Sequence, residues 1–436
     1  MGPPRVPTTV TTPTAPAHWE NALPLASAPR TRRQRLSQRV LRGAIRLGMT
    51  LYAATLRRAP ARPIHRPVRV LVTMTTHSEA WARAHLRPLA AAPACGGVIA
   101  VTARPLGAIE GVQWRCPPAA LTRIAGEVPA RLLLFIWIAL TQRPDLLGGF
   151  HLQMNGLAAT WAARMIRARS AYFCVGGPRE VIDGGVWSEN RVFAKLPAPD
   201  PAIERQLLDA VRATDLIVGM GTEAVRYFEG HGLGGRCHVV AGGIDTAVFR
   251  PGTAASDLDI VFVGRLVPIK RVDLFLHAVR YIASAVPDLR VAVVGDGPLR
   301  QDLETLSREL GVSGHVSFAG QQAQVAGWLR RAKIFMLTSE SEGLSLSLME
   351  AMSCGVAPVV ADVGDLGDLV GVECGFLVRE RTAEAFASPA IALLKDADRL
   401  ARVRRAAAVA AAAYTVEATT ARWEAILPGL ERINRS

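Results

Sequence analysis

Two glutamates flank a glycine turn in the segment 340–355, and together they could hold a ligand rich in hydroxyl groups. Glu342 lies in the turn, and Glu350 lies in the segment after it, where apolar residues recur at helical spacing. The first amides of a helix lack partners within it and carry partial positive charge, which favours a phosphate. Gly343 has no side chain, so the backbone can approach a ligand closely there. The pattern fits a pyrophosphate between two hydroxyl-bearing ends, as in a nucleotide sugar.

A second group of residues supplies positive charge after the predicted strand 259–263. Gly264 permits close approach of the backbone, Arg265 offers a planar fork for a phosphate, and Lys270 adds a mobile point charge. A departing diphosphate is stabilised by cations and amides that point at its growing negative charge. The candidates for that task are Arg265, Lys270 and the N–H groups of Gly343, Leu344 and Ser345.

A glycine turn after the predicted strand 290–295 is a candidate for the nucleotide base. Gly295 and Gly297 would let the chain pass under a base at this turn. No cluster of Asp and His has the spacing of metal ligands, and an arginine with a lysine can neutralise a diphosphate without a divalent ion. We therefore expect no metal and no cofactor, with a nucleotide-diphosphate sugar as the donor substrate.

The turn at Glu342-Gly343, followed by Glu350-Ala351-Met352 and Gly355, resembles the signature of the family-four retaining glycosyltransferases, also called group 1 glycosyl transferases. Those enzymes have the GT-B fold, an α/β architecture of two facing Rossmann-like domains with an inter-domain cleft. The resemblance covers roughly residues 68–433 and is stronger after Gly242. It implies that Arg265 and Lys270 hold the donor diphosphate, Glu342 the sugar and Glu350 the ribose, and that the anomeric configuration is retained.

One histidine of the family pattern is missing from this chain. Many members place a His-Gly pair near Gly176-Gly177, and that histidine contacts the transferred sugar, whereas this chain has no histidine there. His151, at the end of a predicted strand, and His77, in the loop after the first predicted strand, are the candidates to replace it. A structural role for either histidine is the alternative.

The resemblance and the composition together divide the chain into five parts. The predicted parts are a disordered Pro/Thr-rich tail (1–29), a basic amphipathic helix with a linker (30–65), an N-terminal Rossmann-like acceptor domain (66–243), a C-terminal Rossmann-like nucleotide-sugar-binding domain (244–415) and a C-terminal helix returning to the first domain (416–436). Within the acceptor domain, the apolar stretch 210–219 predicts a strand.

The chain of 436 residues has a formal net charge of +14, carried mostly by arginine, which suggests an anionic partner. We expect no nucleic-acid binding, because aromatic residues of the stacking type are not interleaved with the basic ones. Six cysteines without a C-x-x-C pair indicate reduced thiols and a cytoplasmic location. The longest apolar run, 132–140, is shorter than the roughly 18 residues needed to span a bilayer and predicts a buried helix.

The segment 30–58 has the pattern of an amphipathic helix. Its arginines at 35, 39, 42 and 46 fall in one sector of a helical wheel, and Leu36, Val40, Leu47 and Leu51 lie in the opposite half. One interpretation is a helix in the interface of an anionic membrane, which would place the protein peripherally on the inner face of the plasma membrane. The other is a helix packed on the protein with a solvated basic face.

These observations predict transfer of a sugar from a nucleotide sugar to a sugar or lipid-linked acceptor, in the biosynthesis of a cell-surface polysaccharide or glycolipid. A non-catalytic GT-B scaffold at the membrane is the alternative from another class. Among enzymes, a GT-B epimerase or phosphorylase is the nearest rival, although the arrangement of Glu342 and Glu350 favours transfer.

Overall fold

The computed structural model describes residues 32–56, 60–75, 78–188, 190, 192–196, 198–253 and 256–432, without the side chains of 32–36 and 194. The predicted disordered tail (1–29) and His77 lie outside the described residues, as do the side chains of Arg35 and Leu36.

The first half of the chain forms a seven-stranded parallel sheet with the order β3-β2-β1-β4-β5-β6-β7. Its strands are β1 (Val68–Thr73), β2 (Cys95–Val101), β3 (Val112–Arg115), β4 (Leu146–Phe150), β5 (Arg169–Cys174), β6 (Leu216–Gly219) and β7 (Cys237–Val239). Every residue of β4 and β5 is buried, as expected for parallel strands covered on both faces. The order of the strands reverses between β1 and β4, so this pair marks the switch point of the sheet.

Helices cover both faces of this sheet. The helices of this half are α1 (Arg32–Thr55), α2 (Glu79–Ala91), α3 (Ala119–Ala125), α4 (Glu127–Gln142), α5 (Leu157–Ile166), α6 (Pro201–Arg212) and α7 (Thr222–Gly230). α4 and α5 pack together on one face, in a core that contains Phe135, Ile138 and Leu71, and α2 lies on the other face. The predicted strand 210–219 is wrong in its first part, because α6 continues to Arg212 and β6 begins only at Leu216.

α4 corrects the expectation of a buried helix at 132–140. Phe135 and Ile138 face the sheet, but Leu133, Trp137 and Leu140 are 52%, 59% and 52% exposed. These three side chains recur at the spacing of one helix face. The helix is therefore buried on one face only. The apolar run is continuous because both the buried face and the exposed face carry apolar side chains.

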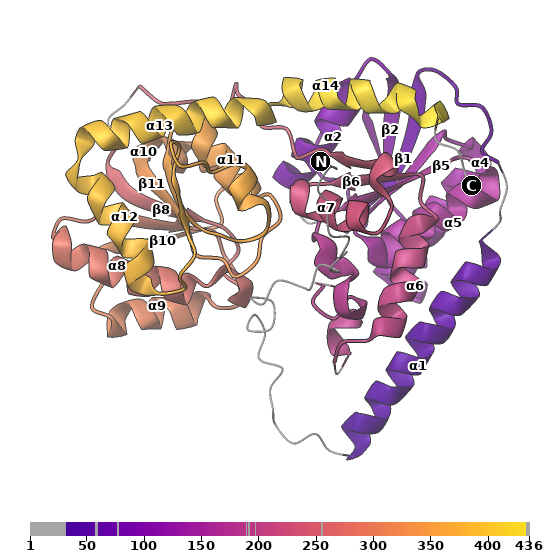
Figure 1. The fold of residues 1–436 in the computed structure, drawn as a ribbon, viewed down its shortest axis with the longest axis horizontal. Coiled ribbons are helices and arrows are strands. Elements are labelled where there is room, and N and C mark those ends of the chain that lie inside the picture. Colours follow the sequence, from indigo (N-terminus) through magenta and orange to yellow (C-terminus); the bar gives the residue numbers. More distant parts are fainter. Residues whose placement is uncertain are drawn as a thin grey trace, which may run out of the picture.

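The second half forms a six-stranded parallel sheet with the order β10-β9-β8-β11-β12-β13. Its elements are β8 (Leu258–Val263), α8 (Val272–Ala285), β9 (Val291–Val294), α9 (Arg300–Glu309), β10 (Val316–Gly320), α10 (Val325–Arg331), β11 (Ala332–Leu337), α11 (Leu346–Ser353), β12 (Ala357–Ala361), β13 (Phe376–Val378), α12 (Ala383–Lys395) and α13 (Ala397–Ala411). The two parallel sheets with their helices confirm the expected pair of Rossmann-like units (Figure 1).

The last helix, α14 (Val416–Ile426), lies on the first sheet's half of the molecule. It packs against α2, and its Trp423 is 2% exposed in the same core cluster as Leu86 and Val218. Figure 1 shows α13 and α14 running along one side of the molecule, from the second lobe to the first. Short turns of helix complete the chain: η1 (Leu152–Gly156), η2 (Pro178–Glu180), η3 (Ile182–Gly184), η4 (Phe193–Lys195), η5 (Gly234–Arg236), η6 (Pro268–Lys270), η7 (Gly364–Asp368), η8 (Ala412–Tyr414) and η9 (Leu427–Arg432).

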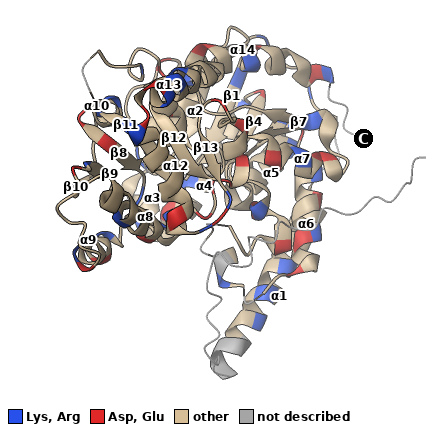
Figure 2. Ribbon diagram, turned by 60° about the vertical axis from the view of Figure 1, so that its left-hand side comes forward, with Lys and Arg blue, Asp and Glu red and all other residues tan. Residues whose placement is uncertain are grey.

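α1 lies beside α6, and Figure 2 shows positions of basic residues, in blue, along its described part. Arg42 Nε and Arg46 Nη2 lie 3.1 and 2.8 Å from the carboxylate of Asp200, and Met49 is buried beneath the helix. Two arginines of the predicted basic sector thus neutralise a carboxylate of the protein. Within the described residues, no helix is both long enough and apolar enough to cross a membrane.

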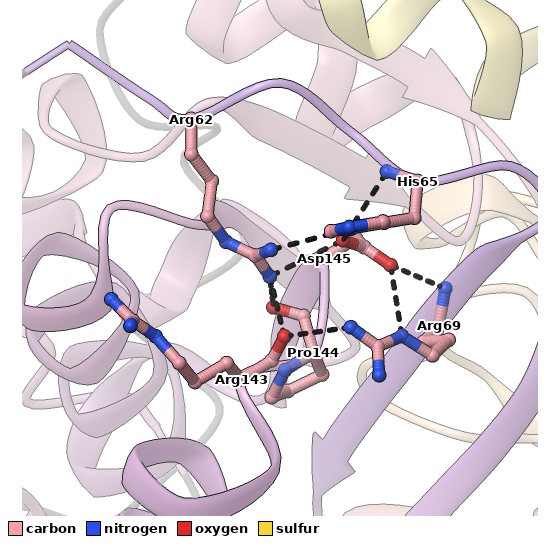
Figure 3. A network of polar contacts seen from close by, with 6 residues as sticks. All are labelled: Arg62, His65, Arg69, Arg143, Pro144 and Asp145. Atoms are coloured by element: carbon pink, nitrogen blue, oxygen red, sulfur yellow. Dashed lines mark hydrogen bonds and ion pairs between the residues drawn. The ribbon is translucent and has the colours of Figure 1, made fainter.

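The linker after α1 is held at the amino end of β4 by a buried carboxylate, Asp145 (Figure 3). Arg62, His65 and Arg69 place side-chain nitrogens 3.2, 2.9 and 3.4 Å from its oxygens. Burial alone would raise the pKa of Asp145, but hydrogen bonds from His65 and the Arg69 N–H and the charge of Arg62 hold that pKa below its usual value. These contacts therefore attach the linker to the first sheet.

Candidate active site

The two sequence motifs of the second half meet at the switch point of its sheet. β8 and β11 are neighbours at the centre of the sheet, and the chain leaves them toward opposite edges. Ligands of open α/β sheets bind at such a point, outside the carboxyl ends of the strands. The loop after β8 carries Gly264, Arg265 and Lys270, and the loop after β11 carries Glu342 and the turn that follows it.

Lys270 and Glu342 are in direct contact. The Lys270 Nζ donates to Glu342 Oε1 at 2.6 Å, and the two side chains are 17% and 9% exposed. The backbones of the two loops are joined as well, because the Glu340 N–H donates to the Ile269 carbonyl at 2.8 Å. Lys270 and Glu342, which belong to motifs far apart in the sequence, therefore lie side by side at the carboxyl ends of β8 and β11.

Arg265 is an exposed residue of the same loop, whose neighbour is the glycine turn after β9. The Leu266 N–H donates to the Asp296 carbonyl at 2.9 Å. Gly295 has a φ of 137°, and a Cβ on it would collide with the carbonyl oxygen of Gly264. A Cβ on Gly297 would likewise meet the backbone of Leu266. These glycines bring the two loops into backbone contact, which the sequence did not predict.

The start of α11 differs from the expectation for Gly343, Leu344 and Ser345. The helix begins at Leu346, and Ser345 is its N-cap: the Ser345 Oγ accepts a hydrogen bond from the Leu348 N–H at 3.4 Å. The N–H groups of the three predicted residues therefore precede the first helical turn rather than form it. The reason is that Ser345 has an extended backbone, as capping residues do.

Glu350 lies within α11, away from its first turn. It is half-buried, and burial raises the pKa of its carboxyl group to about 8. At neutral pH this group is mostly protonated before a ligand arrives, so it can donate a hydrogen bond as well as accept one.

The histidine predicted in the first half, His151, is held by a carboxylate that the sequence reasoning missed. His151 follows β4 with a φ of 66°, and its Nδ1 lies 2.9 Å from Glu180 Oε1. Glu180 is buried and also accepts the N–H groups of Leu152 and Gly176, each at 2.6 Å. Burial alone would raise the pKa of Glu180, but the charge and hydrogen bond of His151 and these amides hold that pKa below its usual value. The only signal in the sequence was a carboxylate within the glycine-rich loop after β5.

The same glycine-rich loop faces the Glu342 turn of the second half. Arg179 Nη1 donates to Ser341 Oγ at 3.0 Å, and its Nε donates to the Gly176 carbonyl at 2.9 Å. A Cβ on Gly343 would come to 3.1 Å from the Val175 carbonyl oxygen. The structure thus brings His151, through Glu180 and the loop after β5, to the side of the second half that carries Lys270 and Glu342.

The two halves also meet at the amino end of α7. The Thr222 N–H donates to Asp368 at 2.8 Å, and the Glu223 N–H donates to Asp365 at 2.6 Å. Burial, followed by the charge of Asp365, raises the pKa of Glu223 to about 7, and burial raises the pKa of Asp365 to about 6. Carboxylates of the second half therefore cap a helix of the first.

A family model described as "Glycosyl transferases group 1" matches residues 244–409. The D-inositol 3-phosphate glycosyltransferase of Thermobispora bispora is 31% identical over 277 residues, which cover 57% of this chain and 64% of that protein. The protein of the same name from Frankia alni is 36% identical over 208 residues, covering 42% of this chain and 51% of that protein. The chain thus spans less than two thirds of the length of either relative.

Two solved structures have the same fold. Anabaena Alr3699/HepE in complex with UDP-glucose aligns with a TM-score of 0.65 at 16% identity, over 83% of this chain and 100% of that one. Sucrose-phosphate synthase from Thermosynechococcus elongatus aligns with a TM-score of 0.65 at 15% identity, over 84% and 100%. The expected GT-B fold is confirmed.

Proposed function

We propose that this chain is a retaining, metal-independent glycosyltransferase of family four that moves a sugar from a nucleotide-diphosphate sugar to an acceptor. The observation that carries the proposal is the contact of Lys270 with Glu342 at the switch point of the second sheet. The match of residues 244–409 to the group 1 model supports it, as do relatives with UDP or UDP-glucose bound.

Lys270 and Arg265 would neutralise the donor's diphosphate, with the turn amides from Gly343 to Ser345 as further donors. As the bond between the sugar's anomeric carbon and the diphosphate breaks, the diphosphate keeps the electron pair, and fixed cations stabilise the charge that develops. The acceptor hydroxyl forms the new C–O bond on the same face, and its proton passes to the departing phosphate oxygen. Two cations in the loop after β8 are the reason for expecting no metal and no cofactor.

The two glutamates would hold the ends of the donor. The contact between Glu342 and Lys270 would break when the donor binds. Lys270 would then contact the diphosphate, and Glu342 would accept hydrogen bonds from the sugar hydroxyls. Glu350, with its raised pKa, would bind the ribose hydroxyls as donor or acceptor. Across from them, His151 would contact the sugar from the first half, and Gly264, Gly295 and Gly297 would shape the place of the base.

A membrane role for α1 is part of the proposal. Val40, Leu47 and Leu51 are 64%, 61% and 57% exposed on the face turned away from α6, and α1 contains no acidic residue. An anionic lipid surface fits a helix that combines an exposed apolar stripe with exclusively basic charged residues. α4, which packs against α5 in the same half, carries a second exposed apolar face. A lipid-linked or surface-polysaccharide acceptor follows from this placement, on the inner face of the plasma membrane.

A calorimetric titration with UDP, GDP and ADP, followed by a transfer assay with the sugars of the best binder, tests the proposed activity. We expect binding of one diphosphate and transfer that persists in excess chelator. A chain that binds none of the three would instead be the non-catalytic scaffold at the membrane, which the missing histidine near Gly176 favours. Activity lost in chelator and restored by magnesium would contradict metal independence alone.

A further inference from the structure

A cavity at the edge of the first sheet has no part in the proposed sugar transfer. Its volume is about 460 Å³, which lies in the range of sites for small molecules. The turn after α7, η5 and the edge strand β7 contribute residues to it, as do the end of α14 and η9. Leu216, which also lines the cavity, begins β6, whereas His151 follows the carboxyl end of β4. Because the sheet is parallel, the cavity therefore reaches the edge of the sheet opposite to His151.

The apolar part of the lining is aliphatic. It consists of Leu216, Leu233, Ala425, Ile426 and Leu430. Among the described residues that line the cavity, there is no phenylalanine, tyrosine or tryptophan. A nucleobase is commonly held by stacking on an aromatic face, which this lining does not offer. Aliphatic side chains stabilise a hydrocarbon instead, by removing its surface from water.

Arg236 brings a fixed cation to this cavity. Its Nη1 donates to the carbonyls of Arg212 and Thr214, at 2.8 and 3.1 Å, which holds the guanidinium in place. Its Nε and Nη2 donate to no group in the described part of the chain, and both are accessible to solvent. A guanidinium with free N–H groups can bind a carboxylate or a phosphate through two hydrogen bonds. Arg236 is therefore positioned to receive an anion without first giving up another contact.

Arg432 and His238 make the polar part of the cavity one-sided in charge. Arg432 is exposed on η9, and the carboxylate beside it in the sequence, that of Glu431, pairs with Arg66 at 3.0 Å instead. Within the described residues, neither Arg236 nor Arg432 forms an ion pair, and no aspartate or glutamate lines the cavity. Burial lowers the pKa of His238, so its ring is mostly neutral at neutral pH and offers an N–H donor without a charge. These groups together favour a negatively charged ligand.

We propose that this cavity binds an aliphatic anion, a phosphate or carboxylate that carries a hydrocarbon chain, with Arg236 and Arg432 on the anion and the leucine and isoleucine side chains around the hydrocarbon. An inorganic anion would leave the aliphatic lining wet, and a neutral lipid would leave both guanidinium groups without a partner. The cavity is separate from the proposed donor site, so the proposal does not depend on sugar transfer.

The same chemistry could come from a membrane or from solution. Arg236 contacts the end of α6, and α1 packs along α6. A phospholipid of the surface that α1 is proposed to bind is therefore one source of the anion, and a soluble acyl anion is the other.

Calorimetry on the full chain tests the site with three probes: decyl phosphate below its micelle-forming concentration, decanol and inorganic phosphate. We expect decyl phosphate to bind at least about tenfold more tightly than decanol or inorganic phosphate, equivalent to about 1.4 kcal/mol. Gly235 lines the cavity, and a side chain there would meet no atom within 4 Å, so Gly235→Trp can fill the cavity without moving its neighbours. This variant should weaken the binding of decyl phosphate by about tenfold or more.

Gly314→Trp is the matched control, because Gly314 also faces open space but lies in the turn before β10, in the other half. Gly429→Trp repeats the test from η9, since Gly429 lines the cavity and has open space too; it decides the matter if Gly235→Trp does not unfold cooperatively. Arg432→Gln tests the charge on an exposed residue, and should weaken decyl phosphate but not decanol.

A parent protein that does not bind decyl phosphate, or binds decanol equally well, would overturn the proposal. Equal affinity for decyl phosphate in the Gly235→Trp and Gly314→Trp proteins would overturn it as well. Once binding is shown, vesicles of phosphatidylcholine and phosphatidic acid distinguish the two sources. Weaker co-sedimentation of Gly235→Trp than of Gly314→Trp identifies a membrane lipid, and equal co-sedimentation identifies a soluble aliphatic anion.

Discussion

At the scale of single residues, the proposed sugar transfer requires Lys270 to exchange partners when a donor binds. In the structure its ammonium group donates to Glu342 Oε1 at 2.6 Å. A diphosphate carries more charge than one carboxylate, so it can draw Lys270 away and leave Glu342 to the sugar hydroxyls. The pair thus keeps both side chains in place before the substrate arrives.

Lys270→Met should lower the rate of sugar transfer by at least about 100-fold, because a fixed charge on the leaving group is worth about 3 kcal/mol in a transition state. Steady-state transfer from the best nucleotide sugar measures it. Lys333→Met is the matched control, since Lys333 also pairs with a carboxylate, Asp259 at 2.7 Å, but on the body of β11. A Lys270→Met protein that retains activity within a few-fold of the Lys333→Met protein would remove Lys270 from the mechanism.

In the proposed mechanism Glu180 positions His151 and does not itself touch the donor. Glu180→Gln keeps the shape but cannot accept all the hydrogen bonds from His151, Leu152 and Gly176. We expect kcat to fall by about tenfold or more, by misplacement of His151, while the Kd for UDP is unchanged because the proposed donor site lies in the other half. Glu229→Gln, an exposed change on α7, is the control. A weakened affinity for UDP would show that Glu180 acts through the whole fold instead.

At the scale of elements, α1 and α4 each have a buried face and an exposed apolar face. The first is held by Asp200 and Met49, and its Val40, Leu47 and Leu51 remain outside. Exposed apolar stripes of this length on a monomer mark sites of interaction. Because the charge of Arg46 is paired with Asp200, the proposed membrane affinity would depend more on apolar contact than the arginine pattern alone suggested.

Leu47→Glu with Leu51→Glu should reduce co-sedimentation with vesicles of phosphatidylcholine and phosphatidylglycerol by about tenfold or more, since two apolar insertions become two repelled charges. Val409→Glu is the control, because Val409 is 75% exposed on α13 in the other half. Unchanged co-sedimentation of the double variant would refute the membrane role. Dimerisation that is lost in the double variant would assign the stripe to a second copy of the chain.

At the scale of the whole molecule, we expect the contact between α7 and η7 to make the arrangement of the two halves depend on pH. Glu223 and Asp365 face each other there, with Asp368, Arg179 and Arg226 as charged neighbours. Both pKa values are raised, so the contact is strongest where both groups are protonated. It weakens as pH rises from their usual range of about 4 through the raised values of about 6 and about 7.

Small-angle scattering should therefore report a more open molecule at about pH 8 than at about pH 6, because two ionised carboxylates repel across the contact. Glu223→Gln should lose most of this difference and remain compact at the higher pH. Glu229→Gln, which leaves the contact untouched, should behave as the parent protein does. An identical pH response in the Glu223→Gln protein would exclude this pair as its cause.

Much of the fold and part of the candidate site could be predicted from local pattern. The turns at Gly264 and Glu342 follow apolar runs short enough to be strands, and parallel sheets place such strand ends on one edge. The course of α4 shows the limit, because apolarity indicates that a helix is buried somewhere but not on which face. The start of α11 shows a second limit of prediction from sequence. Ser345 caps the helix with an extended backbone, so the first helical residue is Leu346.

By itself, the sequence determined two α/β halves and the places where their strand-end loops carry charge, because these depend on neighbours in the chain. Only the tertiary structure decided that Lys270 meets Glu342, that Glu180 holds His151, and that Arg131 is buried beside Thr75 with no carboxylate partner among the described residues. Each of these pairs joins residues from different elements. Their energies depend on burial and on the direction of individual donors, which no spacing along the chain encodes.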